Sequence, residues 1–358
     1  MSRMRDINGA PDNTHPIPTK YSNDLRSWPR LRADDHSNQR HEYDSLGPWT
    51  LIMCLQALLL QILISTSPTA ISTVSGFRWN DDLQKVVKLG DGFLKKPEDV
   101  CVDNKGTFYT VTRDGWAKRK HRNEAWENWK KLGGNALLGV AMSNDGHLLV
   151  CDANKASPHL IGFADDVIQA SDGTIYFSDV STKYGLSNWV YDVLEGKPHG
   201  RLLKYSPQTG HTSIHLNHLS FPNGVALSRK QDFLVVCETW KFRCLKHWLK
   251  GKLKGNTSIF VDNLPGGPDN INLAPDGSFW IALLNLRTSG TKELVLEGVA
   301  GKAMVMKVSE DGKMIRKLDD SRGKVMGFVT SALEFEEHLY LGNLNSTFIG
   351  RLNLNKIT

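Results

Sequence analysis

One short pattern recurs six times along this chain of 358 residues. In each copy a polar turn, often Asp-Gly, precedes an apolar run that ends in a small or acidic residue. A turn followed by β-branched and aromatic residues is typical of a hairpin that leads into a strand. The copies are residues 103–112, 144–152, 171–179, 229–238, 275–284 and 335–344.

The spacing of these copies constrains the fold more than any other feature. Their starts lie 41, 27, 58, 46 and 60 residues apart, and four-stranded propeller blades recur at roughly 40–50 residues. The sustained helical periodicity that a parallel α/β fold requires is missing from the sequence. The sequence therefore predicts an all-β fold, a six-bladed β-propeller over residues 72–358.

One of the predicted blades is too short. Only twelve residues separate Asp152 from Asp165, where a complete blade needs two further strands. We therefore expect an incomplete blade near residues 153–164, with sheet edges that a native fold would normally cover.

The first 71 residues have a different character. Residues 1–48 are polar, whereas Trp49–Ile64 is uncharged and, apart from two glutamines, apolar. Sixteen helical residues span about 24 Å, and continuing to Ile71 supplies the rest of the ~30 Å hydrocarbon core. Positive charges precede this segment and none follows it until Arg78, which by the positive-inside rule places the N-terminus in the cytosol.

These features predict a disordered tail over residues 1–48, a transmembrane signal anchor over residues 49–71 and a lumenal body. The protein would then be a single-pass membrane protein of the secretory pathway, in the endoplasmic reticulum or the vacuole. In a lumenal body the sequons at Asn256 and Asn345 would be glycosylation acceptors.

Polar residues recur at the starts of the innermost predicted strands. Each copy has an acidic or amide residue, then one further residue, then an aliphatic residue. Such a ring supplies the hard oxygens that Ca²⁺ prefers, and it offers none of the His or Cys that zinc prefers. The alternative is that these residues only shape turns. The predicted metal ligands are Glu98, Asp165, Asn223, Asp269 and Asn270.

Other chemistries find little support in the sequence. The five cysteines form no CxxC pair and no zinc spacing, and a Cys237–Cys244 disulfide across a hairpin is left open. There is no Gly-x-Ser-x-Gly elbow and no Ser-x-x-Lys motif. The basic clusters at residues 118–122 and 241–254 favour solvated rim segments over a nucleic-acid interface.

The sequence resembles the strictosidine synthase-like proteins, near the group of the adipocyte plasma membrane-associated protein, over roughly Lys85 to Leu354. The resemblance implies a propeller related to paraoxonases and lactone hydrolases, in which a Glu, two Asn and an Asp hold a catalytic calcium ion. Carried onto this chain, Glu98, Asn223 and Asp269 match, with Asn270 beside Asp269, and Asp165 replaces an Asn. The segments that carry the resemblance are Gly139–Lys155, Phe163–Gly185, Lys197–Tyr205, Phe221–Ser228, Val235–Lys246 and Leu264–Leu284.

Two departures bear on activity. Thr330 stands where strictosidine synthase has its acid–base Glu, and Leu138 stands where paraoxonases have their catalytic His. The resemblance therefore implies a Ca²⁺-dependent hydrolase of small-molecule esters or lactones with Asp269 as the catalytic residue, and not a true strictosidine synthase. The alternative is a non-catalytic propeller that binds a ligand or a protein partner.

Overall fold

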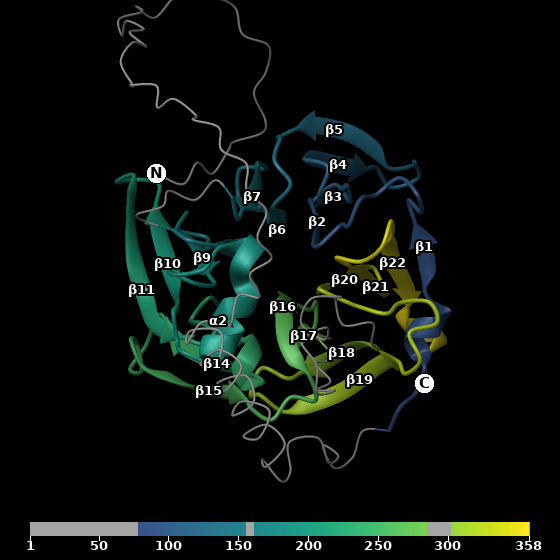
Figure 1. Cartoon of the computed structure of the whole chain (residues 1–358). Helices are drawn as coiled ribbons and strands as arrows, with labels where there is room; N and C mark the ends of the chain where they lie inside the picture. Colours follow the sequence, from purple (N-terminus) through teal and green to yellow (C-terminus); the bar gives the residue numbers. More distant parts are fainter. Residues whose placement is uncertain (1–77, 155–160, 285–301, 358) are drawn as a thin grey trace, which may run out of the picture.

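The hairpin repeats fold into five four-stranded antiparallel sheets and one two-stranded sheet, arranged around a central axis (Figure 1). The computed structural model describes residues 78–154, 161–284 and 302–357. The predicted tail and the apolar segment Trp49–Ile64 lie outside these residues. Among the residues described, no helix is long and apolar enough to cross a membrane.

The first three sheets follow one another along the chain. The first blade comprises β2 (Val100–Val102), β3 (Phe108–Val111), β4 (Trp116–Lys120) and β5 (Glu127–Lys131). The short sheet comprises β6 (Leu137–Met142) and β7 (Leu148–Asp152). The second blade comprises β8 (Ala164–Gln169), β9 (Ile175–Asp179), β10 (Gly200–Ser206) and β11 (His211–Leu219).

Three further blades complete the ring. The third comprises β12 (Pro222–Leu227), β13 (Phe233–Glu238), β14 (Arg243–Trp248) and β15 (Thr257–Val261). The fourth comprises β16 (Gly267–Leu273), β17 (Phe279–Leu284), β18 (Ala303–Val308) and β19 (Met314–Asp320). The fifth comprises β20 (Ser331–Phe335), β21 (His338–Gly342), β22 (Ile349–Asn353) and β1 (Val87–Leu89).

The helices are short. They are the 3-10 turns η1 (Asp82–Lys85), η2 (Leu186–Asn188), η3 (Thr239–Lys241) and η4 (Leu354–Lys356), and the α-helix α2 (Trp189–Glu195). Helix α2 lies between β9 and β10 and covers part of the ring on the side that faces the reader in Figure 1.

The ends of the described chain meet in the fifth blade. Strand β1 pairs with β22, with Val87 opposite Arg351, so an N-terminal strand completes a sheet that is otherwise C-terminal. The innermost strands β2, β6, β8, β12, β16 and β20 each contact the next, and β20 contacts β2. The ring is therefore closed, and apolar side chains of neighbouring sheets fill the space between them, as Phe233 and Phe279 do between the third and fourth blades.

The blade count differs from the prediction. Six blades were expected, whereas the described residues form five complete blades and the two-stranded β6–β7 sheet. The physical reason is chain length: the twelve residues between Asp152 and Asp165 cannot supply two more strands of about five residues each with their turns.

Candidate functional site

The same irregularity recurs in four innermost strands. The register with the neighbouring strand shifts between Leu137 and Val140, Ala164 and Val167, Pro222 and Val225, and Pro268 and Ile271. A bulge of this kind bends a strand and re-aims its side chains. The residues inside three of the four bulges are Asp165-Asp166, Asn223-Gly224 and Asp269-Asn270, so four of the five predicted metal ligands stand in bulges.

The fifth predicted ligand, Glu98, comes just before β2 and joins the others at the axis. The Asn270 side-chain Nδ2 donates to Glu98 Oε1 at 2.8 Å, although the two residues are 172 apart in the sequence. The Asn223 side chain lies close enough to the Asp269 carboxylate to lower its pKa, against the larger effect of burial. Glu98, Asp165, Asn223, Asp269 and Asn270 are all buried. The fold thus gathers all five predicted residues from four blades.

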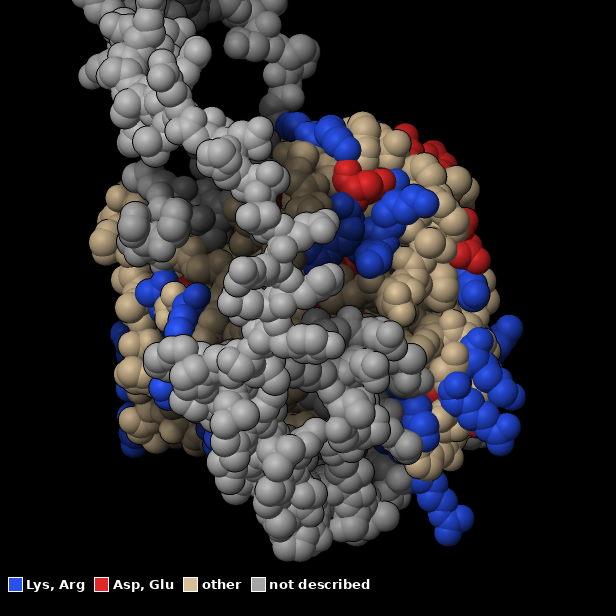
Figure 2. All heavy atoms as spheres, in the orientation of Figure 1, with Lys and Arg blue, Asp and Glu red and all other residues tan. Residues whose placement is uncertain are grey.

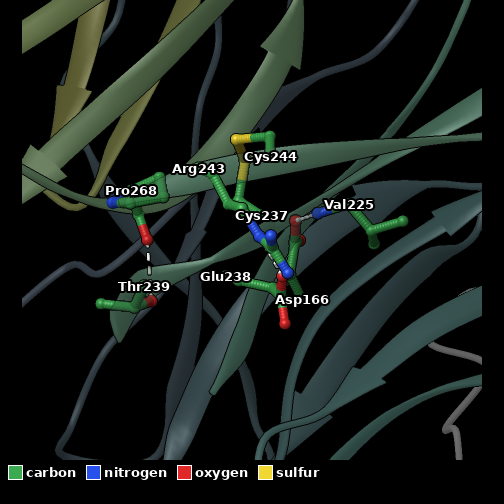
Figure 3. Close-up of a disulfide and its surroundings, with 8 residues drawn as sticks. All are labelled: Asp166, Val225, Cys237, Glu238, Thr239, Arg243, Cys244 and Pro268. Carbon is green, nitrogen blue, oxygen red and sulfur yellow. Dashed lines mark hydrogen bonds and ion pairs between the residues drawn. A yellow bond between two sulfur atoms is a disulfide. The ribbon is translucent and has the colours of Figure 1, made fainter. Parts of the chain in front are cut away.

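The acidic residues that follow Glu98 and Asp165 have a different task. Asp99 Oδ2 accepts from the Val140 amide at 2.9 Å, and Asp166 Oδ2 accepts from the Val225 amide at 2.7 Å. Figure 3 shows the second of these bonds. Each carboxylate joins its own sheet to the next one in the ring, which explains the paired acidic residues at these positions in structural terms.

Gly224 lets neighbouring strands approach closely at the axis. A Cβ atom added there would lie 2.6 Å from the carbonyl oxygen of Asp269 and 2.7 Å from the Cα atom of Asn270. Any side chain at this position would push the fourth blade away from the third. The glycine after Asn223 therefore sets the distance between two predicted ligands.

The carboxyl groups at the axis have raised pKa values. Burial, together with the charges of Asp99, Asp165 and Asp269, holds the pKa of Glu98 well above its usual range. Burial also raises the pKa of Asp99 to about 6 and that of Asp165 to about 7. Burial and the charge of Asp165 hold the pKa of Asp269 well above its usual range. This cluster of negative charge favours a cation or protons.

Three oxygens in this cluster have no partner among the described residues. Glu98 Oε2, Asn223 Oδ1 and Asn270 Oδ1 are buried and accept no hydrogen bond. A buried acceptor without a partner is costly, so such atoms indicate a missing ligand or ion. No three His, Cys, Asp or Glu side chains of the described residues converge closely enough to hold a metal ion, but two of these three oxygens belong to amides. The set of hard oxygens fits Ca²⁺.

The two departures from the catalytic pattern also lie at the axis. Thr330 is fully buried, and its hydroxyl donates to the backbone carbonyl of Glu98 at 2.5 Å. Leu138 stands in the bulge of β6 and is buried. Neither side chain can act as a general acid or base, so proton transfer at this site depends on the carboxyl groups.

One charged residue near the site was not predicted from the sequence. Arg113 lies in the turn between β3 and β4, half-buried, and its charge acts on Glu98 and Asp165. The turn Thr112-Arg113-Asp114-Gly115 looks like many other hairpin turns in sequence. Only the closure of the ring shows that its side chain stands beside the axis.

A partly buried ion pair lies near the disulfide in the third blade (Figure 3). Cys237 and Cys244 are directly opposite in β13 and β14 and form a disulfide, which settles the pairing that the sequence left open. The next residue, Glu238, accepts from Arg243 Nε and from the Ser220 amide, both at 2.7 Å. Thr239 donates to the carbonyl of Pro268 at 2.8 Å, so this hairpin is fixed next to Asp269.

An aromatic group holds α2 against the second and third blades. The rings of Trp189 and Trp240 are stacked, with centroids 6.2 Å apart, and Phe221 contacts both edge-on. Phe163 contacts Phe221 in turn. Because Phe163 and Phe221 each stand two residues before a predicted ligand, Asp165 or Asn223, this group forms an apolar flank of the axial cluster.

Comparison with known sequences places the chain among relatives of one kind. Two family models match, one described as strictosidine synthase over residues 165–252 and one as strictosidine synthase-like, N-terminal, over residues 76–119. The Arabidopsis thaliana protein strictosidine synthase-like 4 is 32% identical over 332 residues, which cover 81% of this chain and 87% of that protein. The human adipocyte plasma membrane-associated protein is 32% identical, with 78% of this chain and 80% of that protein covered.

Similar solved structures support the fold only. A gluconolactonase from Xanthomonas campestris is 14% identical with a TM-score of 0.55, over 75% of this chain and 88% of that chain. A luciferin-regenerating enzyme is 14% identical with a TM-score of 0.51, over 76% of this chain and 96% of that chain.

Proposed function

Because the chain belongs to the strictosidine synthase-like family, we propose that it is a Ca²⁺-dependent hydrolase of small-molecule esters or lactones whose site lies on the propeller axis. The observation that carries the proposal is the set of three buried oxygens without partners, on Glu98, Asn223 and Asn270. A resident cation would satisfy all three and would offset the charges of Asp165 and Asp269.

The residues of the chain divide the chemistry among them. Glu98, Asn223 and Asn270, with Asp165 and Asp269, would hold the ion, and bound Ca²⁺ would supply polarisation of the substrate carbonyl. Asp269 is the candidate catalytic residue, as a nucleophile or as the base that takes a proton from water. The neighbouring Asn223 side chain favours the ionised form of this carboxylate, because it lowers its pKa.

The residues at the two positions where the catalytic pattern has an acid–base group favour a second function, that of a binding protein. With Leu138 and Thr330 buried at the axis, these two positions supply no His and no Glu for proton transfer. A non-catalytic propeller that binds a small molecule or a protein partner through the same metal site is therefore the rival.

Turnover of aryl esters and lactones by the purified residues 71–358, with Ca²⁺ and then with a chelator, decides between the two. The enzyme hypothesis expects turnover that disappears with the chelator and returns with added Ca²⁺. Ca²⁺ binding by calorimetry without any turnover would favour the binding protein instead.

We also propose that the body faces the lumen of the endoplasmic reticulum or the vacuole, anchored through the segment Trp49–Ile64. Membrane association of this kind is in keeping with the name of the adipocyte plasma membrane-associated relatives. The Cys237–Cys244 disulfide suits an oxidising compartment, and Asn256 and Asn345 are exposed. Expression in secretory cells followed by glycosidase treatment should reveal a mobility shift, and Asn256→Gln with Asn345→Gln should remove it.

A further inference from the structure

Arg113 is held in place by the backbone around it. Its amide donates to the carbonyl of Lys95 at 2.8 Å, and the turn closes through the Gly115 amide and the Thr112 carbonyl at 2.9 Å. Gly115 has a φ of +79°, and a Cβ there would lie 2.6 Å from the carbonyl oxygen of Gly134. The turn is therefore packed tightly against the link between the first blade and the short sheet.

The guanidinium of Arg113 has spare hydrogen-bonding capacity. Its Nη1 donates to the carbonyl of Asn135 at 3.2 Å, and no other side-chain hydrogen bond or ion pair joins it to a described residue. An arginine has five N–H donors, so most of them have no partner among the residues that the structure describes. The negative charges of Glu98 and Asp165 raise the pKa of Arg113, yet neither carboxylate forms an ion pair with the guanidinium.

This position places a positive charge at one particular point of the ring. Glu98 belongs to the first blade and Asp165 to the second, and between them the short sheet contributes only the apolar Leu138. Arg113 thus lies beside the short sheet, which like the fifth blade supplies none of the predicted ligands. Burial lowers the pKa of its guanidinium, and the charges of Glu98 and Asp165 partly offset this.

Further basic residues belong to the first blade or the segment just before it. Burial lowers the pKa of Lys118, the charge of Asp114 raises it, and the charges of Lys95 and Lys131 lower it. Lys131 Nζ donates to the carbonyl of Asp114 at 2.6 Å. On the face shown in Figure 2, Lys and Arg side chains gather over the first blade. A positive rim of this kind raises the local concentration of anions and speeds their approach.

We propose that Arg113 recognises the substrate, and that it binds the carboxylate of an ester or lactone that carries a separate anionic group. The proposal rests on the proposed function and names its substrate class. A guanidinium binds a carboxylate through two parallel hydrogen bonds. With the carboxylate held at Arg113, the ester carbonyl of the same molecule would be directed toward the axial carboxyl groups, whose charges act on Arg113.

The test uses two substrates that differ only in this charge: mono-4-nitrophenyl glutarate and the same compound with its free carboxylate methylated. Release of nitrophenolate reports both reactions. In Arg113→Gln the ratio of kcat/KM for the anionic over the neutral ester should fall tenfold or more, mainly through a higher KM for the anionic ester. Arg113→Lys, which keeps the charge without the planar fork, should lose less. Lys252→Gln, an exposed lysine of the third blade, removes the same charge elsewhere and should keep the ratio within twofold.

Two binding measurements separate this proposal from the hydrolase proposal. Glutarate should bind the Ca²⁺-loaded protein in calorimetry, and Arg113→Gln should abolish that binding even if no ester is turned over. Arg113→Gln should also strengthen Ca²⁺ binding, because a positive charge near the ion has been removed. If Arg113→Gln left both the substrate ratio and the glutarate affinity unchanged, the assignment would be overturned. Arg113 would then serve only to bind the carbonyl of Asn135.

Discussion

The buried carboxylates that end β9 and β13 and those at the axis differ in how fully the protein satisfies their hydrogen bonds. Asp179 ends β9 and accepts from the amides of Gly162 and Phe163 and from Arg201 Nε. Glu238 ends β13 and has the same kind of partners, an amide and an arginine. At the axis, Glu98 Oε2 has no partner among the described residues, and no arginine of this part of the chain forms an ion pair with Glu98, Asp165 or Asp269.

This difference separates structure from function. A buried carboxylate that accepts from backbone amides and an arginine stabilises the fold, and nothing further has to bind. Several buried carboxylates without a paired cation lie close together only because ring closure brings their strands together. A bound cation would offset their mutual repulsion. The following predictions test this distinction, from the largest expected effect to the smallest.

Asp269→Ala should reduce ester or lactone turnover by about 10³-fold and weaken Ca²⁺ binding by more than tenfold. The reason is that the removed carboxylate is both the proposed catalytic group and a proposed metal ligand. Steady-state kinetics and calorimetry measure the two effects. Asp179→Ala is the matched control and should keep the Ca²⁺ affinity. Equal Ca²⁺ affinity in Asp269→Ala and the parent would remove Asp269 from the site.

Asp179→Ala should lower the free energy of unfolding by about 3 kcal/mol, because it leaves Arg201 and two amides without their buried acceptor. Urea denaturation in the presence of a chelator gives this value. If Asp179→Ala lowers the free energy of unfolding no more than a substitution at an exposed residue such as Asp311→Ala, the distinction between structural and axial carboxylates is wrong.

Glu98→Gln should have the opposite effect on the metal-free protein at alkaline pH and raise its free energy of unfolding by about 1 kcal/mol, because it removes a carboxylate whose ionisation is opposed by burial and by the neighbouring acidic residues. The same variant should bind Ca²⁺ more weakly. Denaturation with and without Ca²⁺ checks both signs, and a destabilised metal-free variant would show that Glu98 is a structural carboxylate after all.

The pH dependence of the free energy of unfolding also depends on a histidine that belongs to neither group of buried carboxylates. Burial and the charge of His247 lower the pKa of His215 to about 4, from an ordinary value of 6.5. The folded protein then binds fewer protons than the unfolded chain between pH 6.5 and 4, so stability falls as the pH drops through this window. The carboxyls of Asp99 and Asp165, with pKa values raised to about 6 and 7, act in the opposite sense, since they gain stability as the pH falls.

The free energy of unfolding should therefore fall less between pH 7 and pH 5 in His215→Phe than in the parent. The expected difference is about 1 kcal/mol for a half-buried group. Denaturation of variant and parent at both pH values isolates this contribution from that of the axial carboxyls. If the two proteins show identical pH profiles, the His215 ring is already solvated in the folded state.

The amino-acid sequence by itself determined the all-β propeller and the residue types at the axis. Turn signals and apolar runs are local features, so the repeat and the oxygen-rich positions of Glu98, Asp165, Asn223 and Asp269 could be identified without coordinates. The family could be identified for the same reason.

Only the tertiary structure decided the rest. The number of complete blades depended on how the ring closes around a sheet too short to be a blade. Whether an acidic residue joins two strands, as Asp99 does, or keeps an unpaired oxygen, as Glu98 does, depends on contacts between blades far apart in sequence. The place of Arg113 beside the axis follows from the same closure, because a hairpin turn carries no local signal of what its side chain will face.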